Sequence, residues 1–102
     1  KIIKVIIETA YLTEDEIKKA CKICVDAGVD YIKTSTGFAP SGAKIEHIKL
    51  IRQIIPAEVG IKASGGIKNL AQAQAMIEAG ANRIGTSSGV KIMEELRQNG
   101  RQ

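Results

Sequence analysis

Two lysines, Lys33 and Lys62, lie near the ends of short apolar segments, in 32–37 (IKTSTG) and 61–66 (IKASGG). Because strand residues alternate sides, the two can share one face of a parallel sheet, near the carboxyl ends of neighbouring strands. A cationic neighbour and partial burial both lower the pKa of a lysine, and the free amine then attacks a carbonyl carbon. The resulting Schiff base is an electron sink, so the pair predicts the making or breaking of a carbon–carbon bond. The alternative is that both lysines point outward as solvated charges.

Three predicted strand ends carry glycines and hydroxyl groups, in segments 35–37 (STG), 64–66 (SGG) and 86–89 (TSSG). Glycine lets the backbone approach a ligand closely, and free N–H groups at such turns bind anions. The last segment leads into a short predicted helix, whose N-terminus favours a phosphate. These ends therefore predict a phosphate site. The alternative is that they are ordinary turns between strand and helix, which also favour glycine and serine.

The elements that position these residues alternate along the chain. Short β-branched runs predict strands over 2–7, 29–35, 59–64 and 83–87. Thr13 and Glu16 predict a capping box at the start of the first helix, and Gly28 is its expected end. Further helices are predicted over about 43–55, 70–79 and 90–97. Alternating strands and helices predict an α/β fold with a parallel sheet.

An internal repeat supports this architecture, because segment 27–37 (AGVDYIKTSTG) aligns without gaps to segment 79–89 (AGANRIGTSSG). A complete TIM (β/α)8 barrel needs eight strand–helix units and about 250 residues. Four units in 102 residues therefore predict a single half-barrel domain over residues 1–102. An isolated half leaves strand edges and an inner face open. We expect self-association into a dimer that completes a barrel-like core, or rearrangement into an open sandwich.

Composition and charge argue against several other classes of protein. The net charge is +4 and the pI is near 9.2, but Lys and Arg alternate with Asp and Glu, so no nucleic-acid partner is expected. The sequence shows neither a membrane span nor a signal peptide, so a cytoplasmic protein with no membrane partner is expected. Cys21 and Cys24 lie in mid-helix without a further Cys or His pair. We interpret them as core residues and expect no metal site.

The ordered motifs resemble those of the 2-deoxyribose-5-phosphate aldolase family. Four segments carry the resemblance: 5–9 (VIIET), 33–37 (KTSTG), 62–67 (KASGGI) and 85–88 (GTSS). It covers about residues 1–97 and corresponds to the last four strands of the family's barrel.

The resemblance implies that Lys33 forms the Schiff base and that Lys62 is the neighbouring lysine that activates it. It also implies cleavage of a small phosphorylated sugar, 2-deoxyribose 5-phosphate, to acetaldehyde and glyceraldehyde 3-phosphate, without a metal or an organic cofactor. The family's phosphate-binding positions carry over to Gly37, Gly65, Gly66, Ser87 and Ser88.

The chain departs from the family at its proton-relay aspartate, which lies on a strand of the N-terminal half. None of Asp15, Asp26 and Asp30 occupies a matching motif. Because general acid–base catalysis contributes ~10²- to 10⁴-fold, we expect the aldol activity to be weak or lost. The alternative function is a non-catalytic half-barrel scaffold that self-associates and at most binds phosphate. In half of another phosphate-binding barrel, such as an isomerase, the paired lysines would have no obvious task.

Overall fold

The computed structural model describes residues 2–35, 42–86 and 89–99, and strands and helices alternate along it. In chain order the elements are β1 (Lys4–Ile6), the short 3-10 helix η1 (Thr9–Tyr11), α1 (Glu14–Asp26), β2 (Tyr31–Lys33), α2 (Ile45–Ile54), β3 (Gly60–Ser64), α3 (Leu70–Ala79), β4 (Arg83–Gly85) and α4 (Gly89–Asn99). The predicted order of four strand–helix units is confirmed. The strands are shorter than predicted, although Ile7 N and Thr34 N still donate to the neighbouring strands beyond their ends.

Side-chain and glycine signals fix the ends of the helices. Thr13 Oγ1 accepts a hydrogen bond from Glu16 N at 3.2 Å, and Glu16 Oε1 accepts one from Thr13 N at 2.8 Å. This completes the predicted capping box of α1. Asn69 caps α3 by accepting a backbone hydrogen bond of its first turn. Gly28 and Gly80, with φ of 80° and 125°, follow α1 and α3, in backbone that L side chains rarely adopt.

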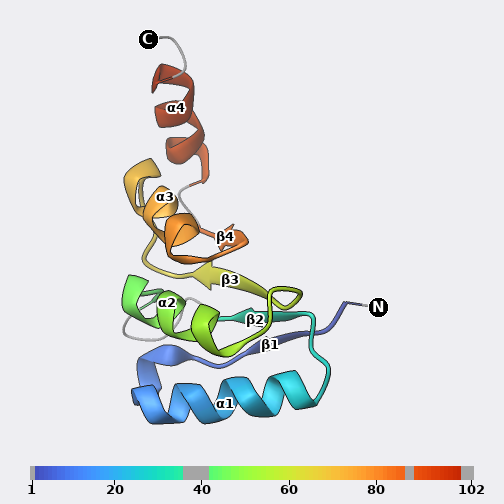
Figure 1. Ribbon diagram of the computed structural model, residues 1–102. Helices are drawn as coiled ribbons and strands as arrows, with labels where there is room; N and C mark the ends of the chain where they lie inside the picture. The colour runs from blue at the N-terminus through green and yellow to red at the C-terminus, as the bar shows by residue number, and fades with distance from the viewer. Residues whose placement is uncertain (1, 36–41, 87–88, 100–102) are drawn as a thin grey trace.

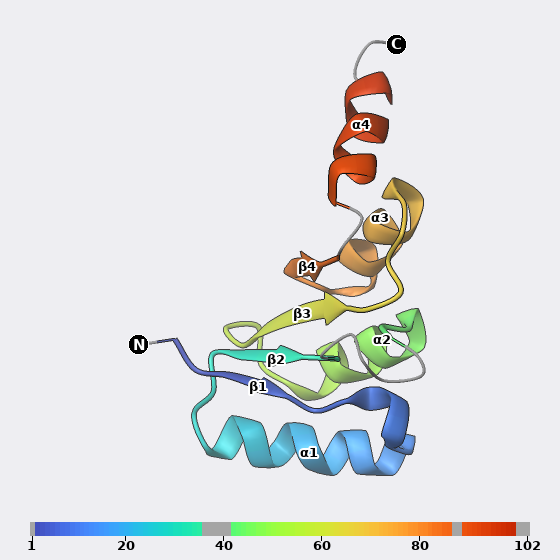
Figure 2. The same ribbon diagram turned by 180° about the vertical axis from the view of Figure 1, so that it is seen from behind.

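The strands form one parallel sheet in the order β1-β2-β3-β4, and α1, α2 and α3 lie beside it in succession (Figures 1 and 2). Ile32 of β2 is the register partner of Ile61 of β3, and both are fully buried beneath the helices. The helices contribute the other half of the core, with Ile17, Cys21, Cys24, Ile48, Ile51, Ala73 and Met76. One face of the sheet is therefore covered, which is the arrangement of half a (β/α)8 barrel and confirms the predicted fold class.

The opposite face of the sheet carries the residues that alternate with this core. Ile6 pairs in register with Lys33, Lys33 with Lys62, and Lys62 with Arg83. Because register partners in parallel strands point the same way, these side chains form a row across the sheet. Ile6 is 44% exposed, and both lysines are half-buried. The face that would line the inside of a complete barrel is therefore open within the described residues.

The two copies of the internal repeat form the same hydrogen bonds at the amino end of the sheet. Asp30 Oδ2 accepts from Ile3 N at 2.8 Å, and Asn82 Oδ1 accepts from Ile61 N at 2.9 Å. In return, Asp30 N donates to Ile3 O and Asn82 N donates to Ile61 O, both at 2.9 Å. Each copy therefore ties the residue before its strand to the strand that precedes it in the sheet.

Arg52 of α2 reinforces the second copy. Its guanidinium donates to Asn82 Oδ1 at 3.1 Å, to Pro56 O at 2.7 Å and to Val59 O at 2.8 Å. A Cβ at Gly80 would lie 2.7 Å from the Arg52 side chain, so the helix-ending glycine also leaves room for this arginine. Arg52 thus joins the loop before β3 to the loop before β4.

Helix α4 packs against α3 and projects beyond the sheet (Figures 1 and 2). Val90, Met93 and Leu96 are 76%, 57% and 48% exposed on it. Over the described ranges, no helix has the length and apolar character needed to span a membrane.

Candidate active site

The two lysines predicted to act together lie opposite each other on adjacent strands. Lys33 ends β2 and is the Cα register partner of Lys62 in β3. Neighbouring strands are about 4.8 Å apart, and side chains at partner positions point to the same face. Ile32 and Ile61, which precede them, are fully buried on the helix side, so both lysines emerge on the open face. The structure therefore brings the two predicted residues together.

Lys62 lies in a strongly cationic part of this face. Its pKa is lowered by partial burial and then by the charges of Lys33, Lys4 and Arg83. A Cβ at Gly85 would lie 3.0 Å from Lys62 Cε, so the lysine stem crosses β4 where that strand has no side chain. The lowered pKa favours the neutral amine, which is the form that attacks a carbonyl.

A contact between Tyr31, Gly60 and Arg83, the last of these at the end of the lysine row, was not predicted from the sequence. The Tyr31 ring lies across β3 at Gly60, where an added Cβ would be 2.3 Å from a ring carbon. The Arg83 guanidinium carbon lies 4.6 Å from the centre of the same ring, a cation–π contact. Arg83 is also the register partner of Lys62, so Tyr31 holds a positive charge beside it. The internal repeat gives the available signal, because it aligns Tyr31 with Arg83.

The strand end after Lys62 has the backbone expected of an anion-binding turn. Gly65 and Gly66 have φ of 84° and 73°, which other residues adopt only with strain. A Cβ at Gly42 would lie 2.2 Å from Gly65 C, so the segment before α2 touches this turn directly. Ala43 N donates to both Ser64 O and Gly65 O, at 3.0 and 3.1 Å. Gly42 was missed in the sequence because this contact joins loops that are distant along the chain.

The other predicted phosphate-binding residues, Gly37, Ser87 and Ser88, lie outside the described residues. Their flanking segments approach the same end of the sheet. The Thr86 hydroxyl donates to Ile67 O, which joins the end of β4 to the loop that follows Gly66.

Two buried hydroxyl groups at the carboxyl end of the sheet have no hydrogen-bond partner among the described residues. They are Thr9 Oγ1, after β1, and Ser64 Oγ, at the end of β3. Thr9 is 1% exposed and Ser64 is 4% exposed. Because burying a polar group without a partner is unfavourable, such groups mark this end as unusual.

Glu8 adds backbone strain at the same end. Its φ of 49° makes it the only non-glycine residue with positive φ in the described part of the chain. A non-glycine residue in the left-handed region costs about 1 kcal/mol or more, and such strain gathers at functional sites. Glu8 is half-buried and directly follows the segment paired with Lys33.

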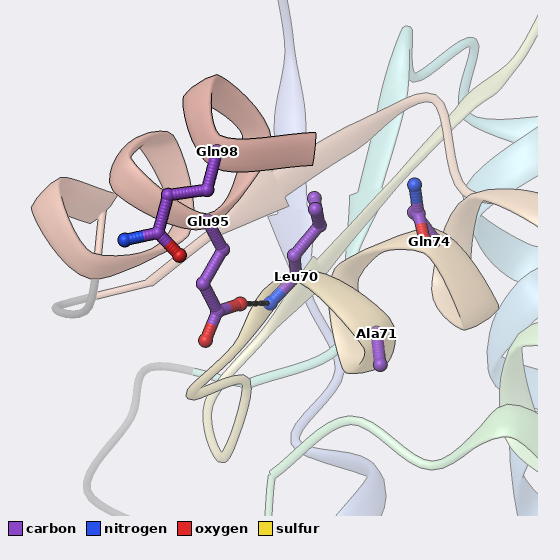
Figure 3. A pocket seen from close by; sticks show the side chains of 5 residues that line it. All are labelled: Leu70, Ala71, Gln74, Glu95 and Gln98. Carbon is purple, nitrogen blue, oxygen red and sulfur yellow. Dashed lines mark hydrogen bonds between the residues drawn. The ribbon is translucent and has the colours of Figure 1, made fainter. Parts of the chain in front are cut away.

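A groove between α3 and α4 lies apart from the lysines and is lined by Leu70, Ala71, Gln74, Glu95 and Gln98 (Figure 3). Glu95 Oε2 accepts a hydrogen bond from Leu70 N at 2.6 Å. This carboxylate thereby satisfies a free N–H of the first turn of α3. The groove lies where α3 and α4 pack together, and neither Lys33 nor Lys62 lines it.

The cysteines are core residues, as predicted. Cys21 and Cys24 are both free and buried in α1. Burial, and secondarily Cys24, raises the pKa of the Cys21 thiol to about 11, which disfavours the reactive thiolate. In residues 2–35, 42–86 and 89–99, no three His, Cys, Asp or Glu side chains gather as metal ligands.

Comparison with known proteins gives a consistent set of matches. The family model described as "DeoC/LacD family aldolase" matches residues 3–95. A deoxyribose-phosphate aldolase of Caldanaerobacter subterraneus is 56% identical over 99 residues, which cover 97% of this chain and 43% of that protein. One of Aquifex aeolicus is 60% identical over 93 residues, covering 91% of this chain and 42% of that protein. The chain thus spans less than half the length of these relatives.

Solved structures agree with the sequence matches. An aldolase named QR15 is similar with a TM-score of 0.91 and 57% identity, covering 95% of this chain and 44% of that one. A deoxyribose phosphate aldolase from Aeropyrum pernix, described as a unique tetrameric structure, has a TM-score of 0.85 and 34% identity. That match covers 94% of this chain and 42% of that one.

Proposed function

The chain belongs to the DeoC/LacD family of aldolases, and we propose that its lysine pair forms a Schiff base with small aldehydes. Lys33 is the proposed nucleophile and Lys62 the neighbour that supports it. The observation that carries the proposal is their register pairing on the open face, at the carboxyl ends of adjacent parallel strands. Partial burial, and then the charges of Lys33, Lys4 and Arg83, lower the pKa of Lys62, which favours a neutral amine at Lys62, beside the proposed nucleophile.

The proposed substrate is 2-deoxyribose 5-phosphate, the sugar phosphate that the family resemblance implies. The lysine nitrogen bonds to the carbonyl carbon, the carbonyl oxygen leaves as water, and an iminium ion remains. A base takes the proton of the C3 hydroxyl, whose oxygen becomes the carbonyl oxygen of the released glyceraldehyde 3-phosphate, and the iminium accepts the electron pair of the C2–C3 bond that breaks. The bound two-carbon enamine then takes up a proton and is hydrolysed to acetaldehyde. The protonated imine is itself the electron sink, so the proposal includes no metal and no organic cofactor.

The proposed phosphate site combines Gly65 and Gly66 with Gly37, Ser87 and Ser88. Consecutive positive φ values at Gly65 and Gly66 support it, because successive backbone N–H groups in such a turn form an anion-binding concavity. Thr86, hydrogen-bonded to Ile67 O, supports the approach of the β4 end to that turn. We propose weak turnover by the 102-residue chain, because active sites of barrels draw residues from the ends of several strands.

Borohydride trapping tests the proposed function. The chain is incubated with acetaldehyde and reduced, and the modified lysine is located by peptide mapping. We expect one ethyl group on Lys33, loss of this adduct in Lys33→Leu, and slower adduct formation in Lys62→Leu. Lys49, exposed on α2, provides the matched control, and Lys49→Leu should be trapped like the parent. Equal labelling of the parent and Lys33→Leu would reject Lys33 as the nucleophile.

A second candidate is a self-associating scaffold without catalysis. Ile3, just before β1, and Ile6 within it are 49% and 44% exposed. Within the described residues β1 is an edge strand with an open hydrogen-bonding side. A dimer that covers this edge and the open face would bury them. Light scattering distinguishes the outcomes: a dimer without any trapped adduct favours the scaffold, whereas a stable monomer contradicts the proposed self-association.

A further inference from the structure

The hydroxyl of Ser64 is buried at the end of β3 and has no hydrogen-bond partner in the described part of the chain. The residue is 4% exposed, so its side chain is almost completely shielded from bulk water. A buried hydroxyl that makes no hydrogen bond destabilises the folded state. This loss is recovered when a bound molecule supplies the missing hydrogen bond, and such groups therefore call for a functional explanation.

The backbone of Ser64, in contrast to its side chain, is fully hydrogen-bonded. Ser64 N donates to Thr34 Oγ1 at 3.0 Å, and Thr34 Oγ1 donates to Ser64 O at 3.2 Å. Ala43 N also donates to Ser64 O, at 3.0 Å. Because Thr34 is itself fully buried, these bonds fix the end of β3 before any ligand binds. Groups that are already held in place lose less entropy on binding.

The Ser64 hydroxyl lies on the same face of the sheet as the two lysines. Ser64 follows Lys62 by two positions in β3, and residues two apart on a strand point the same way. An added Cβ at Gly85, the register partner of Ser64, would lie 2.7 Å from Ser64 Oγ and 3.0 Å from Lys62 Cε. The hydroxyl and the lysine stem therefore border the same position on β4, where the glycine leaves room for both.

Ser64 also lies between the two proposed ends of the substrate. Lys33 is the register partner of Lys62, and Ser64 is about 7 Å further along β3 toward its carboxyl end. The next residue, Gly65, begins the turn proposed to hold the phosphate and has a φ of 84°. A molecule with its carbonyl carbon at Lys33 and its phosphate at this turn places the intervening carbon atoms beside Ser64. In 2-deoxyribose 5-phosphate, two of those carbons carry hydroxyl groups.

We propose that Ser64 is a specificity-determining residue of the lysine site, whose side chain hydrogen-bonds a hydroxyl of the substrate between its carbonyl and its phosphate. This rests on the proposed function and narrows the substrate class to hydroxylated aldehyde phosphates. A buried polar group discriminates against an analogue that lacks the matching group, because the protein group then stays unpaired. Ser64 thus favours sugar phosphates over plain aldehyde phosphates of the same length.

Borohydride trapping with two aldehydes tests this role. One is 2-deoxyribose 5-phosphate. The other is 5-oxopentyl phosphate, which has the same chain length and phosphate but no hydroxyl group. The full chain is reduced briefly at increasing concentrations of each aldehyde, and all adducts on Lys33, cleaved or intact, are counted to give the half-saturating concentration. Each variant is compared with the parent for the same aldehyde, so the different fractions of free aldehyde cancel.

Ser64→Ala removes the hydroxyl and leaves an apolar side chain. We expect it to raise the half-saturating concentration of the sugar phosphate ~10-fold, the effect of about one hydrogen bond, and to change that of 5-oxopentyl phosphate less than ~2-fold. Its urea midpoint should be no lower than that of the parent, because an unpaired buried hydroxyl is lost. Ser64→Cys keeps a side chain of similar size with a weak donor and should show a smaller loss for the sugar phosphate alone.

Thr9→Val is the matched control, because it removes the other unpartnered hydroxyl, at the end of β1 and two strands away from β3. It should bind both aldehydes as the parent does. An equal change for both aldehydes in Ser64→Ala, or no change for either, would overturn the role of Ser64 and leave the Lys33 adduct of the parent standing. The same selective loss in Thr9→Val would also overturn it. Absence of any Lys33 adduct in the parent would overturn the proposed function together with this inference.

Discussion

At the amino end of the sheet, Asp30 and Asn82 exchange hydrogen bonds with neighbouring strands, and Arg52 satisfies two loop carbonyls. At the carboxyl end, Thr9 and Ser64 bury hydroxyls without partners among the described residues. That end also carries a strained glutamate and the lysine row. In barrels of this type the first end serves stability and the second serves chemistry. We therefore expect substitutions at the amino end to destabilise the protein, and removal of strain at the carboxyl end to stabilise it.

Arg52→Ala should have the largest effect on the free energy of unfolding, a loss of about 3 kcal/mol. The substitution leaves two backbone carbonyls and the Asn82 amide oxygen without the charged donor, and hydrogen bonds to charged groups are the costly ones to remove. Urea unfolding measures the change. Lys49→Ala, on the exposed side of the same helix, should stay within about 0.5 kcal/mol of the parent. A loss no larger than this control would contradict the stabilising role of the amino end.

Asn82→Ala should cost about 2 kcal/mol, because it leaves the N–H of the fully buried Ile61 without its side-chain acceptor. Asn82→Asp keeps an acceptor for both Ile61 N and Arg52 and should lose much less. Thermal unfolding of the two variants side by side gives the comparison. Equal losses would show that the side-chain acceptor is not what matters at this position.

Glu8→Gly should have the opposite sign and stabilise the protein by about 1 kcal/mol. Glycine adopts the left-handed backbone at this position without steric cost, which outweighs the extra freedom it gives the unfolded chain. Urea unfolding of Glu8→Gly and Glu8→Ala separates strain from side-chain loss, since alanine retains the strain. A destabilised glycine variant would mean that the Glu8 side chain contributes to the fold.

Much of the fold followed from local patterns. The capping box at Thr13, the end of α1 at Gly28 and the whole of α3 (Leu70–Ala79) agree with the sequence prediction. Strand alternation was enough to place Lys33 and Lys62 on one face, because a five-residue strand and its neighbours keep the two-residue period. The paired glycines at 65 and 66 were recognised because they directly follow a predicted strand.

The remaining features depend on contacts between distant segments. Arg52 reaches Asn82, which lies thirty residues away, and nothing near Arg52 in the sequence indicates this partner. Gly42 contacts Gly65 only because two loops converge. A side chain at position 60 would clash with the Tyr31 ring, which crosses β3 there. The left-handed backbone of Glu8 could not be predicted, since glutamate rarely adopts it. Tertiary packing decides each of these, not local preference.

The central claim is that Lys62 destabilises the fold while it speeds Schiff-base formation at Lys33. The most direct test is to measure the unfolding free energy of Lys62→Met from neutral to alkaline pH. The pKa of Lys62 is lowered in the folded state, so the charged form weakens the fold below that pKa. This penalty disappears as pH rises through the folded pKa to the ordinary value. We predict that Lys62→Met is more stable than the parent by about 0.5 kcal/mol at neutral pH. We also predict that the gap closes in alkali and that Lys33 is trapped more slowly. A less stable variant at neutral pH with unchanged trapping would contradict the account.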